Sequence, residues 1–302
     1  MNEVNAWSVE LPDGSILRQG DRHDRLMLGL LTATSRWVYE SRASEDMTSL
    51  LTEQPGLVWL RDDRLLGALL SSMQRAPVAA IRRLVIRDGG MRPFFFDTVL
   101  SLAEARLYDL GARRLSIENC AEWLVRELSA RGYHLQDDVV YYRHRLRAMP
   151  DSGGNRQVSI RPAVEGDLPA ILAIDHAAFD GFWRLNEPLL RRGLGTETYM
   201  VAVWRGRVVG YLMAEMQGRL GYIGRLGVLP ECQQRGIGTR LMVEALDRLR
   251  RVGVAEVVLN TQRGNHRSRL LYEKLGFNLT GMTDTFWARE LTREEPVPLI
   301  EG

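Results

Sequence analysis

The chain carries the same glycine landmarks twice, and this repeat constrains its fold more than any other feature. Each landmark lies in a similar local pattern in both copies: within paired apolar runs, beside a short apolar segment, or directly before an aromatic residue. A near-constant separation at several landmarks indicates a duplicated unit. The pairs are Gly67 and Gly210 (143 residues apart), Gly111 and Gly253 (142), and Gly132 and Gly276 (144).

The duplication predicts two domains, at residues 1–147 and 157–302, joined by a linker over 148–156 that is rich in turn residues. Strands are expected to alternate with helices, and apolar runs such as Met200–Trp204 and Arg207–Glu215 form antiparallel pairs. The expected fold class is therefore α/β (α+β), with a mixed sheet flanked by helices in each domain.

A glycine-containing turn, Gln233–Thr239, lies in the second half between an apolar run and an amphipathic helix over 237–251. The first N–H groups of a helix lack partners and carry partial positive charge, so such a turn can hold a phosphate. Gly236 and Gly238 lack the side chains that would keep a diphosphate away from the backbone. Their spacing matches neither the dinucleotide fingerprint nor the P-loop.

A second motif, Asn265–Phe277, reads as a short helix closed by Gly276 and followed by a strand. It has the form N-x-x-S-x-x-L-Y-x-x-x-G-F, and the turn upstream has the form Q/R-x-x-G-x-G. The two motifs, in this order and with a helix and a strand between them, resemble those of the GCN5-related N-acetyltransferase (GNAT) superfamily. The resemblance implies a mostly antiparallel sheet that splits near its middle, with acetyl-coenzyme A as co-substrate.

The resemblance also implies the roles of single residues. The backbone of Leu226–Val228 would bind the pantetheine arm, the turn would bind the pyrophosphate, and Tyr272 would protonate the departing thiolate. A half-buried packing residue is the alternative for Tyr272. The implied cofactor-binding set is Leu226, Gly227, Val228, Gln233, Gln234, Arg235, Gly236, Ile237, Gly238, Thr239, Asn265 and Ser268.

The first copy lacks these features. Phe94–Phe96 fall opposite Gly236–Gly238, and Leu128, which cannot donate a proton, falls opposite Tyr272. The first domain is therefore expected to be a degenerate GNAT-like copy that packs, shapes the acceptor site or binds something else. This layout is similar to that of the tandem mycothiol synthases.

The general base is not evident from the sequence. Asn260 and Tyr222 stand where members of the family carry a glutamate, so neither usual base is present. Glu215 is the nearest carboxylate that could act, with an exposed strand-end carboxylate as the alternative.

The acceptor wall is expected at an aromatic cluster, Phe179, Phe182 and Trp183, which suggests a partly apolar acceptor; core packing is the alternative. Trp287, beside Phe286 in the last expected strand, could close the same pocket.

These features predict transfer of an acetyl group from acetyl-CoA to a primary amine by direct attack, in the second domain. The acceptor would be a small molecule or a peptide. A non-catalytic acyl-CoA sensor, or a transferase of another acyl group, is the alternative. The net charge of +2 argues against a nucleic-acid partner, and no apolar run is long enough to span a membrane. Two cysteines far apart in the sequence and no evident signal peptide favour a cytoplasmic location. A monomer or homodimer is expected, and no metal.

Overall fold

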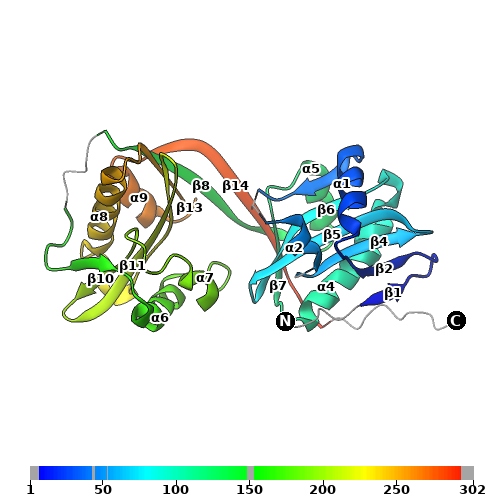
Figure 1. The fold of residues 1–302 in the computed structure, drawn as a ribbon, viewed down its shortest axis with the longest axis horizontal. Helices are drawn as coiled ribbons and strands as arrows, with labels where there is room; N and C mark the ends of the chain where they lie inside the picture. The colour runs from blue at the N-terminus through cyan, green and yellow to red at the C-terminus, as the bar shows by residue number, and fades with distance from the viewer. Residues whose placement is uncertain (1–6, 43–44, 53, 148–152, 294–302) are drawn as a thin grey trace. The chain divides into compact units, whose positions relative to one another are not determined.

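The computed structural model describes residues 7–42, 45–52, 54–147 and 153–293 (Figure 1). The chain forms two compact units: unit 1 comprises residues 1–136 and 285–302, and unit 2 comprises residues 137–284. None of the helices in the described part of the chain combines the length and apolar character that a membrane-spanning helix needs.

Unit 1 is built on a sheet with the strand order β1-β2-β4-β5-β6-β7-β14, with β3 paired to β6. Most neighbours are antiparallel, and β6 and β7 are parallel. The strands are β1 (Ser8–Glu10), β2 (Ile16–Gln19), β3 (Trp37–Glu40), β4 (Gly56–Arg61), β5 (Arg64–Arg75), β6 (Val78–Ile86), β7 (Arg114–Glu118) and β14 (Asn278–Glu290). The helical segments are α1 (Asp24–Thr34), α2 (Met47–Thr52), η1 (Gly89–Met91), α3 (Arg92–Phe94), η2 (Phe95–Val99), α4 (Leu100–Asp109) and α5 (Glu122–Ser129).

Unit 2 repeats this plan with the strand order β9-β10-β11-β12-β13-β8, in which β12 and β13 are parallel. The strands are β8 (His134–Arg145), β9 (Ser159–Pro162), β10 (Tyr199–Trp204), β11 (Arg207–Gln217), β12 (Leu220–Val228) and β13 (Glu256–Gln262). The helical segments are η3 (Glu165–Asp167), α6 (Leu168–Ala178), α7 (Glu187–Arg191), η4 (Pro230–Cys232), α8 (Ile237–Arg251) and α9 (His266–Lys274).

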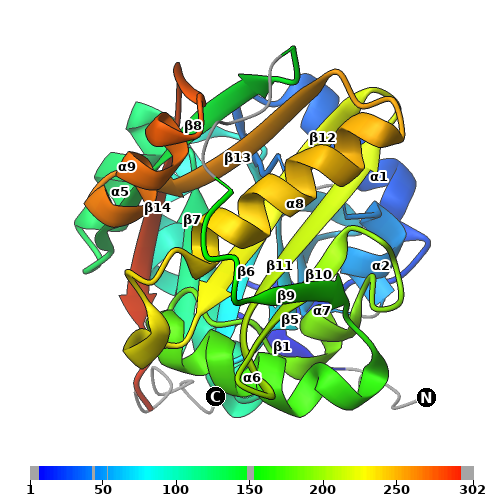
Figure 2. The same ribbon diagram turned by 90° about the vertical axis from the view of Figure 1, so that its left-hand side faces the viewer.

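The two faces of the unit 2 sheet carry different helices, because side chains alternate along each strand. Leu212 and Ala214 of β11 pack in the core that includes α8, whereas Tyr211 and Met213 pack in the core that includes α6. Figure 2 shows α8 crossing the strands β11 and β12. The apolar stripe expected on this helix is fully buried: Ile237, Leu241, Met242, Ala245, Leu246 and Leu249.

The structure confirms the α/β class, with mixed, mostly antiparallel sheets flanked by helices. Two corresponding ion pairs, one in each copy, also support the duplication. Arg18 and Asp24 form a bidentate ion pair with N–O distances of 2.7 and 2.8 Å, and Arg161 and Asp167, each 143 positions later, form another at 2.6 and 2.8 Å. In both copies the arginine lies at a strand and the acid beside the first helix of that copy.

The compact units do not coincide with the expected domain boundaries, because each copy gives its last strand to the other unit. The first-copy strand β8 pairs with β13 through residues 139–145, and the second-copy strand β14 pairs with β7 through residues 286–290. Phe286 and Trp287 thus belong to unit 1 and not to the unit with the glycine turn. Of the expected linker, residues 148–152 lie outside the described residues.

Candidate active site

The sheet of unit 2 splits beside the glycine turn. β12 pairs with β13 over Leu220–Ile223, and in the described residues no pairing with β13 continues along Gly224–Val228. β13 instead continues beside β8, and the far part of β12 stays paired with β11 on its other side. The edge of Leu226–Val228 that faces the split therefore has backbone groups available to a bound chain.

Gly236 is required at the turn by its conformation. It is the N-cap of α8 and has a φ of +74°, in the left-handed region that L side chains rarely adopt. A Cβ atom there would lie 3.1 Å from the backbone nitrogen of Asn155, whose side chain donates to the Arg235 carbonyl oxygen. A Cβ at Gly238 would meet no heavy atom closer than 3.5 Å, so Gly238 mainly keeps the turn open.

One pocket joins the two motifs. It contains about 1250 Å³ of empty space, part of it open to solvent, and it is lined by the turn, by the split edge of β12 and by α9. Phe179 lines the same pocket. Ten of the expected cofactor-binding residues take part: Leu226, Val228, Gln233, Gln234, Gly236, Ile237, Gly238, Thr239, Asn265 and Ser268.

Two residues of the expected set do not line this pocket. A Cβ on Gly227 would lie 2.6 Å from the Tyr211 ring, so this glycine allows β12 to pack against that ring. The guanidinium of Arg235 lies 5.3 Å from the centre of the Trp204 ring. Asn265 lines the pocket but also caps α9, since its side-chain oxygen accepts from the Ser268 N–H at 3.1 Å.

Tyr272 is not among the residues that line this pocket. It is 6 % exposed and packs against the rings of Tyr142 and Phe277 at centroid distances of 5.9 and 6.0 Å. Burial raises the pKa of its hydroxyl to about 12, and a hydrogen bond with the Ser268 side chain opposes that shift. The hydroxyl thus stays protonated at neutral pH and reaches a serine that lines the pocket.

A row of polar side chains crosses the α6 face of the sheet at the split. Glu215 lies opposite Tyr222 in the β11–β12 register, and Asn260 lies opposite Tyr141 in the β13–β8 register. The Asn260 amide hydrogen-bonds with the hydroxyl groups of both tyrosines, and the Tyr141 hydroxyl donates to Asp284 at 2.5 Å. Burial raises the pKa of both tyrosine hydroxyls.

Sequence reasoning did not find Tyr141 or Asp284 in this row. Tyr141 lies on β8, which in sequence belongs to the first copy, and Asp284 lies near the middle of β14. No local pattern marks either residue, because only the exchange of strands brings Tyr141 beside β13.

The aromatic segment is held by a buried ion pair that the sequence did not reveal. Asp175 is fully buried and accepts from Arg225 Nε at 2.8 Å, from the Tyr211 hydroxyl at 2.5 Å and from the Leu185 N–H at 2.8 Å. The Arg225 guanidinium lies 3.5 Å from the Phe179 ring centre and donates to the Trp183 carbonyl oxygen.

The three aromatic residues have different surroundings. Phe182 is buried and packs edge-on against Trp183, with ring centres 5.0 Å apart. Trp183 is half-buried and donates from its indole N–H to Asp137 at 3.0 Å. Phe179 lines the pocket of the glycine turn. Phe182 therefore has the environment of a packing residue, and Phe179 that of a wall residue.

The equivalent of the glycine turn in unit 1 is filled with aromatic side chains. Phe95 and Phe96 are fully buried, and Phe94 stacks on Trp59 with ring centres 5.3 Å apart. Pro93 supplies no N–H donor there. In the described residues no group of three or more His, Cys, Asp or Glu side chains is arranged to hold a metal ion.

Comparison with known proteins agrees with this geometry. Residues 168–277 match the family model described as "Acetyltransferase (GNAT) family". The chain is 30 % identical over 146 residues to the mycothiol acetyltransferase of Paenarthrobacter aurescens, covering 43 % of this chain and 45 % of that protein. It is 26 % identical over 133 residues to the [ribosomal protein bS18]-alanine N-acetyltransferase of Escherichia coli, covering 43 % and 88 %.

A third relative, N-alpha-acetyltransferase 30 of Schizosaccharomyces pombe, is 39 % identical over 57 residues, which cover 19 % of this chain and 38 % of that protein. The match thus spans less than half the length of this relative and of the mycothiol acetyltransferase.

Solved structures resemble the whole chain. A GCN5-related N-acetyltransferase from Sphaerobacter thermophilus aligns with a TM-score of 0.58 and 20 % identity, covering 93 % of this chain and 97 % of that one. A tandem GNAT protein from the clavulanic acid biosynthesis pathway aligns with a TM-score of 0.56 and 16 % identity, covering 91 % and 98 %. At these identities the likeness is one of fold, and it includes both copies.

Proposed function

Because the chain belongs to the GCN5-related N-acetyltransferase superfamily and has its tandem-domain layout, we propose that unit 2 is an acetyl-CoA-dependent N-acetyltransferase. The acceptor is a primary amine of a small molecule or peptide, and the amine attacks the thioester directly. The observation that carries the proposal is the single pocket in which the glycine turn, the split edge of β12 and the start of α9 meet.

The residues present fit coenzyme A. The turn at Gly236 presents the first N–H groups of α8, and its left-handed backbone leaves no side chain in front of them. The unpaired edge of Leu226–Val228 can hydrogen-bond an extended pantetheine arm as a further strand would. The other expected residues that line this pocket are Gln233, Gln234, Ile237, Gly238, Thr239, Asn265 and Ser268.

The chemistry requires three proton transfers. The acceptor ammonium must lose a proton before its nitrogen attacks the carbonyl carbon, and we assign that proton to Glu215 through a water molecule. The C–N bond then forms, the nitrogen releases its second proton to water, and the C–S bond breaks. Tyr272 donates its hydroxyl proton as negative charge develops on the sulfur, and solvent restores it. The pKa of about 12 keeps Tyr272 protonated beforehand.

The acceptor approaches along the α6 face of the sheet, where Glu215 and Tyr222 lie. Phe179 and Trp183 provide an apolar wall, and the Asp175–Arg225 ion pair holds their segment in place. Transfer of another acyl group is a variant of the same chemistry. The cytoplasmic location and the monomeric or homodimeric state stay predictions.

A non-catalytic acyl-CoA sensor is the second candidate. It is favoured by the burial of Tyr272 and by the absence of a carboxylate at positions 222 and 260. Incubation of the full chain with acetyl-CoA and a panel of amines, followed by detection of free thiol and acetylated product, separates the two. The transferase releases coenzyme A in proportion to product, whereas a sensor releases none above the rate of spontaneous hydrolysis.

A further inference from the structure

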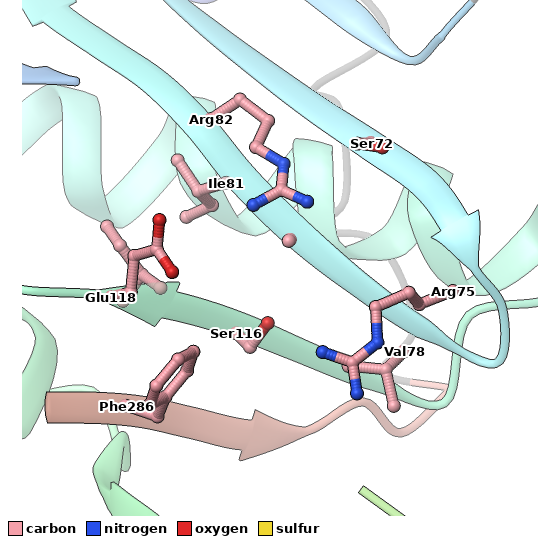
Figure 3. A pocket seen from close by; sticks show the side chains of 10 residues that line it. Ser72, Arg75, Val78, Ile81, Arg82, Ser116, Glu118 and Phe286 are labelled. Carbon is pink, nitrogen blue, oxygen red and sulfur yellow. The ribbon is translucent and has the colours of Figure 1, made fainter. Parts of the chain in front are cut away.

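Unit 1 contains a cavity at the split of its own sheet (Figure 3). β6 pairs with β7 only over Val78–Ala80 and Arg114–Ser116, and the two strands then separate. The cavity holds about 420 Å³ of empty space, part of it open to solvent. Its polar lining consists of Ser72, Arg75, Arg82, Ser116 and Glu118.

The side chains at this cavity differ from those at the corresponding place in unit 2. Ser72 lies opposite Ala80 in unit 1 as Glu215 lies opposite Tyr222 in unit 2. Ala80 and Ser116 are paired in the parallel register, as Tyr222 and its β13 partner are 142 positions later. A serine and an alanine thus stand in unit 1 where unit 2 has a glutamate and a tyrosine.

A β-bulge directs Arg82 into this volume. The β5–β6 register passes from Leu70 opposite Arg83 to Ser71 opposite Ile81, so Arg82 is the extra residue. Such a bulge re-aims the side chain that it carries. Unit 2 has a bulge at the same place, but its extra residue is Gly224, which carries no side chain.

Both positive and negative side chains line the cavity, and they lie at different places around it. Figure 3 shows the guanidinium groups of Arg82 and Arg75 directed toward the opening between β6 and β7, with the Glu118 carboxylate on another side of it. Arg82 is 15 % exposed, and its Nε lies 2.7 Å from Glu45 Oε1. Glu118 accepts a hydrogen bond from the Ser41 hydroxyl.

This arrangement matches a small molecule with opposite charges at its two ends. A guanidinium binds a carboxylate through two parallel N–H···O bonds, which makes arginine the favoured partner for that group. A carboxylate such as that of Glu118 can bind an ammonium group in the same cavity.

We propose that unit 1 binds a small amino-acid-like zwitterion in this cavity. Arg82 and Arg75 hold the ligand carboxylate, Glu118 holds its ammonium group, and the Ser72 and Ser116 hydroxyls complete the polar wall. The site lies outside the pocket of the glycine turn and does not depend on acetyl transfer. The degenerate copy has lost the phosphate turn and gained a binding site of another chemistry.

The experiment is a titration of the full chain with small amino acids, including glycine, alanine, serine and glutamate, followed by calorimetry or ligand-observed NMR. Acetate and ethylamine, which each carry one of the two charges, are the reference ligands. At least one amino acid is expected to bind roughly tenfold or more tightly than either reference, because each end adds a charge-assisted contact. No binding by any amino acid, or equal binding by acetate, overturns the proposal.

Four variants locate the site. Ala80→Tyr places the side chain of Tyr222 in the cavity and is expected to abolish binding. Arg82→Met and Glu118→Gln are expected to weaken it roughly tenfold or more. Arg83→Met, on the same strand but paired with the exposed Glu40 and outside the residues that line the cavity, is the matched control and keeps wild-type affinity.

Arg82→Met leaves Glu45 without its arginine and can lower stability, so each variant is compared by its melting temperature. Ala80→Tyr and Glu118→Gln keep that ion pair and carry the test if Arg82→Met does not fold. Unchanged binding in folded Ala80→Tyr contradicts the assignment of the site to unit 1.

Discussion

Gly236 shows how one residue determines both the local backbone and access to a ligand. Its φ of +74° suits glycine, and a Cβ atom at this position would crowd Asn155. Tyr272 combines a buried ring with a hydroxyl to which we assign the proton donor role. Its ring packs against Tyr142 and Phe277, while its hydroxyl reaches Ser268 at the pocket wall.

Gly236→Phe is expected to abolish binding of acetyl-CoA, because it puts into the turn the residue type found in unit 1. Gly253→Phe is the matched control. Gly253 lies just after the other end of α8 and has a φ of +88°, and a Cβ atom there would meet no heavy atom within 4 Å. Both variants strain a left-handed position, and only the first should lose binding by calorimetry. Equal affinities in two folded variants would show that the turn does not bind the cofactor.

Tyr272→Phe is expected to lower kcat by about 10²–10⁴-fold and to leave the Kd for acetyl-CoA nearly unchanged, because the hydroxyl acts as charge develops on sulfur. Tyr142→Phe is the control, since it removes the hydroxyl of the adjacent ring, which bonds Glu273 and Arg269. Single-turnover kinetics measure the chemical step directly. Full activity of Tyr272→Phe in that assay would make Tyr272 a packing residue.

The same tyrosine predicts a pH dependence of stability. The pKa of Tyr272 is about 12 in the folded chain and near 10 in an unfolded one, so the folded state holds the proton more tightly. Its contribution is fully present below about pH 10 and is lost as the pH rises toward 12. Between about pH 10 and pH 12, the free energy of unfolding of Tyr272→Phe should therefore fall by about 2 kcal/mol less than that of the wild type. Parallel curves from denaturant titrations would contradict the pKa shift.

At the scale of elements, β8 and β14 are exchanged between the copies, and this could not be read from the sequence. The helix α8, its glycine turn and the second motif could be predicted from the sequence, because the residues that define each of them lie close together along the chain. The pairing of β8 with β13 joins residues more than a hundred positions apart, and no local pattern encodes it. Tyr141 and Asp284 were missed because they lie on the exchanged strands β8 and β14. Tyr222 was found by counting back from the glycine turn, and Glu215 as the nearest carboxylate on the preceding strand.

Glu215→Gln tests the proposed general base, Glu215, which lies opposite Tyr222 in the β11–β12 register. We expect kcat/KM to fall by about 10²-fold or more near neutral pH, because the amide cannot take the acceptor proton. Asp284→Asn, which keeps an acceptor for the Tyr141 hydroxyl, is the comparison. A pH–rate profile of each variant measures the effect. Wild-type rates in Glu215→Gln together with a loss in Asp284→Asn would move the base to β14.

At the scale of the whole molecule, one sequence plan has produced two units with different side chains at the turn and at the split of the sheet. Unit 2 keeps a glycine at the turn and large polar side chains on the α6 face of the split. In unit 1, buried phenylalanines occupy the position of the turn, and Ser72 and Ala80 line the cavity at the split of the sheet. The repeat itself was visible in the sequence, and so was the loss of the turn. The cavity in unit 1 was not, because it depends on the register of three strands.

The central claim is that this chain has one acetyl-CoA site, formed by the glycine turn of unit 2. Calorimetric titration of the full chain with acetyl-CoA tests it most directly. We predict saturation at one equivalent per chain, because Phe94–Phe96 occupy the corresponding place in unit 1. Saturation at two equivalents, or no binding at all, would contradict the account.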